Sequence, residues 1–199
     1  MQILSVVLDC SFQGLAHQKD GIEQAQGQKR DGDTHHHDYN RFYQSHKVID
    51  FTVGPPLERI GDLAEKLGRF ELELIDEGST STEYAKLEHL GTLVSKLLNR
   101  SLNAFARMDA EAALKAIKKD KKVNAEYDAL MRQLITRMME DPRNIKNVLR
   151  VTWCARSLER IGDHSRNICE YVLFLVYGKD MRHTAYKDMK NQIDQITQD

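Results

Sequence analysis

Six residues occur twice in this chain, because residues 57–62 and residues 158–163 both read Leu-Glu-Arg-Ile-Gly-Asp. An identical hexamer repeated at an offset of 101 residues, from 57 to 158, predicts an internal duplication with one copy in each half of the fold. In each copy a Glu and an Asp lie four residues apart, which on a helix places both carboxylates on one face. A glycine inside a helix costs about 1 kcal/mol relative to alanine, so each hexamer also predicts a close approach to the helix backbone. Each copy is therefore a candidate site.

The composition favours an all-α protein. Only 3 Pro and 11 Gly interrupt a chain in which 30% of the residues are charged and 41% are apolar. The 199 residues are enough for one sizeable core, or for two small helical bundles that share an interface. Because 29 basic residues nearly balance 30 acidic ones, the net charge of -1 argues against a general nucleic-acid binder and against a polybasic membrane anchor.

The sequence predicts neither a membrane protein nor an oxidising compartment. Residues 1–8 are apolar, but they lack a basic region and are followed by Asp9, which makes a poor signal peptide. The other apolar run, residues 171–177, is far shorter than the ~20 residues that a membrane span needs. The 3 cysteines show no CxxC spacing and predict neither a disulfide framework nor a structural zinc site. We therefore expect a soluble protein of the reducing cytosol.

The first hexamer is expected on a helix that begins near Pro56, because Gly54-Pro55-Pro56 is tolerated in a first helical turn but not inside a helix. This helix is expected to run to about Asp76 and to end at Gly78. Residues 1–54 have little helical periodicity and predict an irregular segment. Within that segment, His35-His36-His37 could bind a metal, although a solvated stretch is the more frequent outcome for such a run.

Residues 80–178 predict three long helices joined by short turns. A capping box at Thr80-Ser81-Thr82-Glu83 begins an amphipathic helix of about 26 residues. Asp109 is expected to cap the second helix. Asp141-Pro142 then opens the third helix, which Gly178 ends. Short turns between long helices predict an up-down-up antiparallel bundle.

Apolar side chains recur at spacings of three and four along these helices, which predicts one buried stripe on each. The stripes are expected to include Met108 in the first helix, Leu134 in the second and Val176 in the third. Trp153, Met138 and Met139 are also expected to pack inside the bundle. A short further helix is expected within residues 185–199.

The second and third helices each carry a row of side-chain oxygens at a spacing of four residues. The rows are Asp120, Asn124 and Asp128 on the second helix, and Glu159, Asp163 and Asn167 on the third. Counted from the turn at Asp141, Asn124 lies 17 residues back and Glu159 lies 18 residues forward. At ~1.5 Å of rise per residue, two antiparallel helices bring these rows side by side.

Four carboxylates and two amides that face one another at the edge of a core would repel strongly without compensation. A cation would resolve the conflict, and an all-oxygen ligand set favours Mg, Mn or Fe over zinc. The alternative is a solvated band of salt bridges to Arg160, Arg166, Lys121 and Lys122, which is the more frequent fate of charged rows. The spacing leaves both possibilities open, and the duplication of the hexamer favours a site.

Other chemical motifs are weak. The chain has no Glu-x-x-His pair of the kind that builds di-iron sites in ferritin-like bundles, and it has no glycine-rich phosphate loop after a strand. His164 and His183 are isolated, and a single helical histidine is more often a surface or core residue than a catalytic base. A carboxylate-bridged metalloenzyme on a helical bundle remains an alternative, as does a scaffold that binds no metal.

The two hexamers and the segments 120–128 and 154–163 resemble the PhoU family, the phosphate-transport accessory and regulatory proteins of bacteria. The resemblance covers roughly residues 57–183. It implies two three-helix bundles related by internal duplication, with acidic motifs that bind multinuclear metal clusters. The positions of this chain that match those motifs are Glu58, Asp62, Asp120, Asn124, Asp128, Glu159 and Asp163.

The resemblance implies an adaptor that catalyses no reaction. Such a protein couples a phosphate ABC transporter, through its ATPase, to a sensor histidine kinase of the membrane. It is a negative regulator that represses the phosphate-starvation response and controls phosphate uptake. The resemblance also implies a cytoplasmic protein, often a homodimer, that acts at the inner face of the membrane through these partners without inserting into it. No nucleic acid partner is implied.

The sequence departs from the family pattern before residue 57, where the family has two long helices and most of a third. We therefore expect residues 1–54 to be an irregular segment that does not match the family. Residues 55–78 are expected to form the remaining third helix of a truncated N-terminal bundle. Residues 79–183 are expected to form a complete C-terminal three-helix bundle, and residues 184–199 a tail. Glu58 and Asp62 are then poorer metal ligands than the second copy, because no acidic row faces them. An altered reading frame or a truncated copy would produce such a junction, which sequencing codons 1 to 60 tests.

Overall fold

The computed structural model describes residues 53–76, 82–182 and 184–196, and every element in these ranges is helical. The predictions made for residues 1–52, for Gly78 and for His183 fall outside the described residues, as do those for Thr80 and Ser81 of the capping box. The elements are α3 (Gly54–Asp76), α4 (Thr82–Arg107), α5 (Ala110–Glu140), the short 3-10 helix η1 (Pro142–Asn144), α6 (Ile145–Tyr177) and α7 (Tyr186–Ile196).

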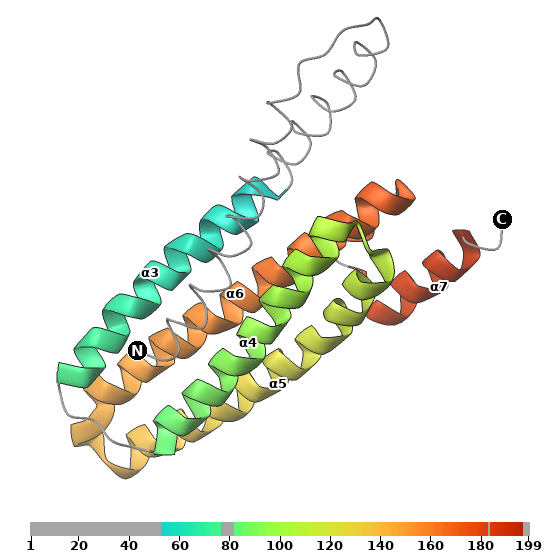
Figure 1. The fold of residues 1–199 in the computed structure, drawn as a ribbon. Coiled ribbons are helices and arrows are strands. Elements are labelled where there is room, and N and C mark those ends of the chain that lie inside the picture. Colours follow the sequence, from blue (N-terminus) through green and yellow to red (C-terminus); the bar gives the residue numbers. More distant parts are fainter. Residues whose placement is uncertain (1–52, 77–81, 183, 197–199) are drawn as a thin grey trace, which may run out of the picture.

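Helices α4, α5 and α6 pack side by side as the predicted antiparallel bundle (Figure 1). Asp109 caps α5, because its carboxylate accepts a hydrogen bond of 2.8 Å from the N–H of Ala112. Gly178 ends α6 in a left-handed conformation with a φ of 67°, and its N–H donates to the carbonyl of Phe174 at 2.8 Å. Both helix ends lie where the sequence predicts them.

The entry to α6 differs in one detail from the prediction. Pro142 opens η1, and α6 itself begins three residues later at Ile145. The carboxylate of Asp141 accepts a hydrogen bond of 3.2 Å from the N–H of Arg143, which holds this first turn in the tighter 3-10 form.

The apolar stripes of the three helices meet in one core. Its large, fully buried side chains include Leu97, Leu98, Ile117, Leu134, Leu158 and Ile161. Met108, Met139 and Val176 were predicted inside the bundle, and this prediction is wrong, since all three are exposed. They lie in the last turns of their helices or just beyond, where the neighbouring helices no longer cover the stripe. Met108 follows the end of α4 with a positive φ of 50°.

Helix α3 lies antiparallel beside α6, outside the three-helix bundle (Figure 1). The Phe70 ring of α3 packs against the Trp153 ring of α6 with 5.5 Å between ring centroids. One turn along, Arg150 Nε of α6 lies 3.1 Å from Glu73 Oε2 of α3. Trp153 therefore contacts α3 and is 48% exposed, which corrects the prediction that it packs inside the bundle.

The register of α3 against α6 brings the two hexamers together. Glu73 of α3 contacts Arg150 of α6, and Phe70 of α3 contacts Trp153 of α6. Extended along the two antiparallel helices, this register places Gly61 level with Gly162. Gly61 and Gly162 are the equivalent residues of the two hexamers, so this register sets the two hexamers level with each other. The internal duplication thus appears in space as two hexamers that lie side by side.

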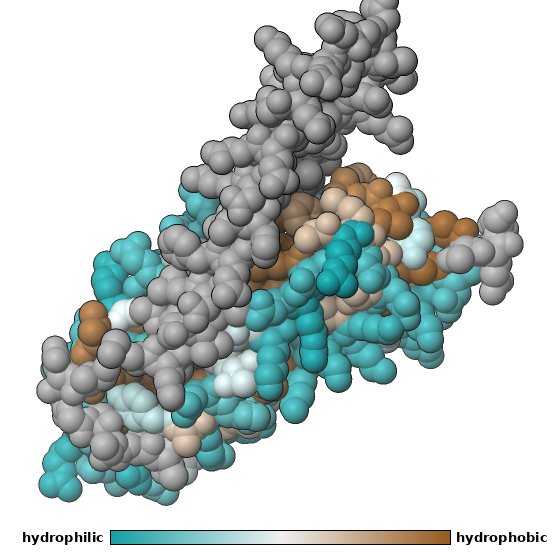
Figure 2. All heavy atoms as spheres, in the orientation of Figure 1, coloured by the Kyte–Doolittle hydropathy of each residue, from teal (hydrophilic) through white to brown (hydrophobic). Residues whose placement is uncertain are grey.

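The C-terminal helix α7 packs on α5. Met189 and Ile193 of α7 are buried, and Lys118 Nζ of α5 lies 5.9 Å from the centre of the Tyr186 ring. Figure 2 shows that the described surface is mainly hydrophilic on this face, with apolar side chains gathered near the end of the bundle where α6 finishes. Within the described ranges, no helix combines the length and the apolar character that crossing a bilayer requires.

Candidate functional site

The glycine of the second hexamer lies at a close contact between α5 and α6. A Cβ atom added at Gly162 would lie 3.3 Å from Val123 Cγ1 and 3.8 Å from Asp120 Oδ1, both on α5. The predicted close approach to the helix backbone is therefore confirmed at Gly162. At Gly61, a Cβ atom would meet no described atom within 4 Å, so the first copy shows no such approach within the described residues.

Asp120 is the most buried acid of the predicted rows, with 1% of its surface exposed. Its Oδ2 lies 3.6 Å from Arg166 Nη1, and its Oδ1 has no hydrogen-bond partner among the described residues. Burial raises the pKa of Asp120 to about 6, the charge of Asp163 adds to this shift, and Arg166 opposes it. The folded chain thus holds a carboxylate in surroundings that disfavour its charge.

Asn124 and Glu159 extend this arrangement on the two facing helices. Asn124, one turn along α5 from Asp120, has a buried Oδ1 without a hydrogen-bond partner in the described part of the chain. Glu159 of α6 is 17% exposed, and its Oε2 forms an ion pair of 3.4 Å with Arg156 Nη1. Burial raises the pKa of Glu159, and the charges of Asp163 and Asp120 raise it further. The charges of Asp120 on α5 and Glu159 on α6 therefore act on each other across the contact of the two helices.

The ends of the rows are more open. Asp163 is exposed as a whole residue, although burial of its carboxylate raises its pKa, with partial compensation from His164 and Arg156. Asp128 and Asn167 are exposed. Among the described residues, no three Asp, Glu, His or Cys side chains converge closely enough to form a preformed metal cage.

The atoms present nevertheless fit a hard cation. Asp120 Oδ1, Asn124 Oδ1 and Glu159 Oε2 are buried, and none of them accepts a hydrogen bond from a described residue. Buried oxygens normally accept hydrogen bonds, so these three atoms on two facing helices have unused capacity to bind a positively charged group. Carboxylate and amide oxygens are the donors that Mg²⁺ and Mn²⁺ prefer.

Part of the alternative salt-bridge band is also present. Arg166, one of its predicted members, pairs with Asp120 and with Glu170, whose Oε1 lies 2.8 Å from Arg166 Nε. Sequence reasoning missed Arg156 as the partner of Glu159. Their spacing of three residues on one helix was the signal that could have revealed the pair.

A shallow depression of about 580 Å³ opens beside the acidic residues of α6. Its lining is formed by Arg156, Arg160, Asp163, His164, Arg166, Asn167 and Glu170. Burial lowers the pKa of His164, and its buried Nδ1 has no hydrogen-bond partner among the described residues. The lowered pKa favours the neutral form of His164, and the permanent charges around the depression are those of its arginines.

The first hexamer has different surroundings. Glu58 is exposed, and Asp62 is 54% exposed and pairs only loosely with Arg59 at 3.8 Å. The two copies therefore share a sequence and differ in burial.

The chain is similar in sequence to known proteins over most of its length. The PhoU domain model matches residues 87–172, a range that contains the second hexamer and both acidic rows. A phosphate-specific transport system accessory protein PhoU homolog of Pseudomonas aeruginosa is 48% identical over 150 residues, which are 75% of this chain and 60% of that protein. The phosphate-specific transport system accessory protein PhoU of Escherichia coli is 47% identical over 138 residues, or 69% of this chain and 56% of that protein. The chain thus spans little more than half the length of these relatives.

Solved structures show the same fold. The crystal structure of PhoU from Pseudomonas aeruginosa aligns with a TM-score of 0.66 and 35% identity, covering 89% of this chain and 88% of that one. The phosphate transport system regulatory protein PhoU from Streptococcus pneumoniae aligns with a TM-score of 0.59 at 23% identity, which supports the fold alone. The curated relatives are named accessory proteins of the phosphate-specific transport system, and at 47–48% identity over 69–75% of its length the chain belongs to the PhoU family.

Proposed function

We propose that this chain is a cytoplasmic regulator of phosphate transport that binds a divalent or trivalent cation between α5 and α6. The observation that supports the cation site is a set of three buried oxygens without a hydrogen-bond partner, Asp120 Oδ1, Asn124 Oδ1 and Glu159 Oε2, of which only the last has an ion-pair partner, Arg156. Asp163 and Asp128 extend the set at its more open edge. The cation, Mg, Mn or Fe, supplies positive charge to the acidic row, and the chain catalyses no reaction there.

The regulatory role is supported by the relatives, which are named accessory proteins of the phosphate-specific transport system. We propose that the chain contacts the ATPase of a phosphate ABC transporter and a sensor histidine kinase, and that it represses the phosphate-starvation response when phosphate is plentiful. It acts at the inner membrane face through these partners, as a homodimer. Sedimentation of the purified chain tests the dimer, and a monomer at micromolar concentration would contradict it.

Repression in living cells tests the proposed role. The chain is expressed in a bacterium that lacks its own copy of the relative, and a phosphate-starvation reporter is measured in high phosphate. We expect the chain to restore repression, and we expect the variant Glu159→Ala with Asp163→Ala to restore less. A fully active reporter despite normal amounts of folded chain would contradict the proposal.

A further inference from the structure

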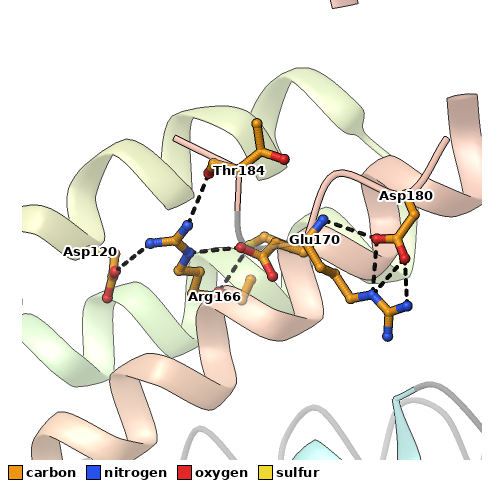
Figure 3. Close-up of polar contacts among 8 residues, drawn as sticks. Asp120, Arg166, Glu170, Asp180 and Thr184 are labelled. Carbon is orange, nitrogen blue, oxygen red and sulfur yellow. Dashed lines mark hydrogen bonds and ion pairs between the residues drawn. The ribbon is translucent and has the colours of Figure 1, made fainter. Parts of the chain in front are cut away.

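Arg166 joins three acceptors from three different parts of the chain (Figure 3). From its place on α6, its Nη1 lies 3.6 Å from Asp120 Oδ2 of α5, and its Nε lies 2.8 Å from Glu170 Oε1 one turn further along α6. Its Nη2 lies 3.5 Å from the carbonyl oxygen of Thr184, in the segment that leads to α7. The guanidinium therefore stands at the junction of α5, α6 and the C-terminal segment.

The contacts of Arg166 differ in kind. The contact to Glu170 is a short charge-assisted hydrogen bond between largely buried groups, with side-chain exposures of 28% and 5%. The contact to Asp120 is too long for a hydrogen bond and acts as a charge interaction alone. Arg166 is thus anchored on Glu170 and is only loosely held beside Asp120.

We propose that Arg166 is the built-in counter-cation of the acidic site and sets its affinity for metal ions. In the metal-free protein its guanidinium partly neutralises Asp120, and it moves away from Asp120 when a divalent cation binds there. This inference rests on the proposed cation site.

The physical reason is competition for one carboxylate. A divalent cation on Asp120 would lie within a few ångströms of the Arg166 guanidinium, and two like charges at that separation repel strongly in partly buried surroundings. The guanidinium can move away from Asp120 at a small cost in free energy, because its hydrogen bond to Glu170 does not depend on Asp120. Metal binding therefore replaces the Arg166 guanidinium beside Asp120 with the divalent cation.

The movement of the Arg166 guanidinium away from Asp120 is expected to affect the C-terminal segment. Arg166 Nη2 is its link to the carbonyl of Thr184, and the segment is also held by the buried side chains of Met181, Met189 and Ile193 and by the contact of Lys118 with the Tyr186 ring. The N–H groups of Asp188 and Met189 donate to the carbonyl of Ala185 at 2.9 and 3.0 Å. These amides report on the segment by hydrogen exchange.

Calorimetric titration with Mn²⁺ tests the inference on the full chain. Arg166→Gln removes the counter-cation, and we expect it to tighten Mn²⁺ binding by about tenfold or more. Arg160→Gln is the matched control, because Arg160 is on the same helix and lines the same depression. We expect the control to change the affinity by less than about threefold.

Arg166→Gln leaves the buried Glu170 without its cation and could impair folding. A second variant, Arg166→Gln with Glu170→Gln, replaces the pair by two neutral side chains that can bond to each other. It is expected to show the same tighter binding, with folding checked by circular dichroism. Hydrogen exchange at Asp188 and Met189 is expected to be faster in metal-free Arg166→Gln, and also in the unmodified chain once Mn²⁺ is bound.

The possible outcomes separate the two claims. Unchanged or weaker Mn²⁺ binding in both Arg166 variants would overturn the counter-cation while leaving the cation site in place. Equal tightening in the Arg160 control would also overturn it, because the effect would then be one of general charge. If neither the unmodified chain nor any variant binds Mn²⁺, the cation site fails and the counter-cation fails with it.

Discussion

At the scale of single residues, Gly61 and Gly162 are equivalent in sequence and differ in surroundings. Gly162 faces Val123 across the α5–α6 contact, whereas Gly61 faces no described atom within 4 Å. The sequence alone could identify a glycine under constraint in each hexamer. It could not say which of the two is constrained by packing, because this depends on the helix that lies opposite.

The surroundings of the two glycines predict that substitution by alanine changes the free energy of unfolding differently at the two positions. Gly61→Ala should raise the free energy of unfolding by about 0.5–1 kcal/mol, because alanine is the better helix former and meets no described neighbour. Gly162→Ala brings the same gain but forces Val123 or α5 to shift, so we expect no gain or a net loss. Urea denaturation measures both variants. Equal stabilisation by the two would contradict the close approach of α5 to Gly162.

Asp120 predicts how stability depends on pH. Its pKa is about 6 in the folded chain and 3.8 ordinarily, so the folded state binds its proton more tightly. The ionised carboxylate therefore destabilises the metal-free fold above pH 6, and this cost disappears as the pH falls below about 4. Asp120→Asn should stabilise the metal-free chain at pH 7 and have little effect near pH 4.

Unfolding of both chains in a chelator at several pH values checks this prediction. If Asp120→Asn destabilises the chain equally at pH 7 and pH 4, the prediction is wrong. The ionised carboxylate would then stabilise the fold through its contact with Arg166. Mn²⁺ binding by the unmodified chain is expected to weaken as the pH falls through 6, because protons and metal compete for Asp120.

At the scale of helices, α3 is attached to the bundle chiefly through α6. The Phe70–Trp153 ring contact and the Arg150–Glu73 ion pair lie near one end of this interface. Trp153→Ala should lower the free energy of unfolding by about 1–2 kcal/mol, less than for a fully buried tryptophan. Met139→Ala is the control, because Met139 is 79% exposed and should contribute less than about 0.5 kcal/mol. Urea denaturation of both variants checks this, and equal effects would contradict the role of Trp153.

Most helix boundaries could be predicted from the sequence, because local chemistry sets them. Asp109 caps α5 with its own carboxylate, and Gly178 ends α6 in a conformation that favours glycine. Trp153 could not be placed correctly, because its partner Phe70 belongs to a helix outside the bundle. The contact of Arg166 with Asp120 likewise depends on the rotation of α5 and α6 about their axes, which periodicity gives only approximately.

At the scale of the whole molecule, the described structure is one three-helix bundle with a fourth long helix against it. The register of the α3–α6 contact places the two hexamers level with each other, and the charge of Asp120 of α5 acts on Glu159 of the second. Duplication alone predicts two equivalent sites. In the described structure the acids of the first hexamer are exposed, whereas Glu159 of the second hexamer is 17% exposed and interacts with the charge of the buried Asp120.

The measurement that tests this account most directly is a calorimetric Mn²⁺ titration of the unmodified chain and two matched double variants. Glu159→Gln with Asp163→Asn neutralises the second hexamer, and Glu58→Gln with Asp62→Asn makes the same change in the first. We expect the second-hexamer variant to lose binding and the first-hexamer variant to bind within about twofold of the unmodified chain. Retained binding in the second-hexamer variant, or its loss in the first-hexamer variant, would contradict the assignment of the site to α5 and α6.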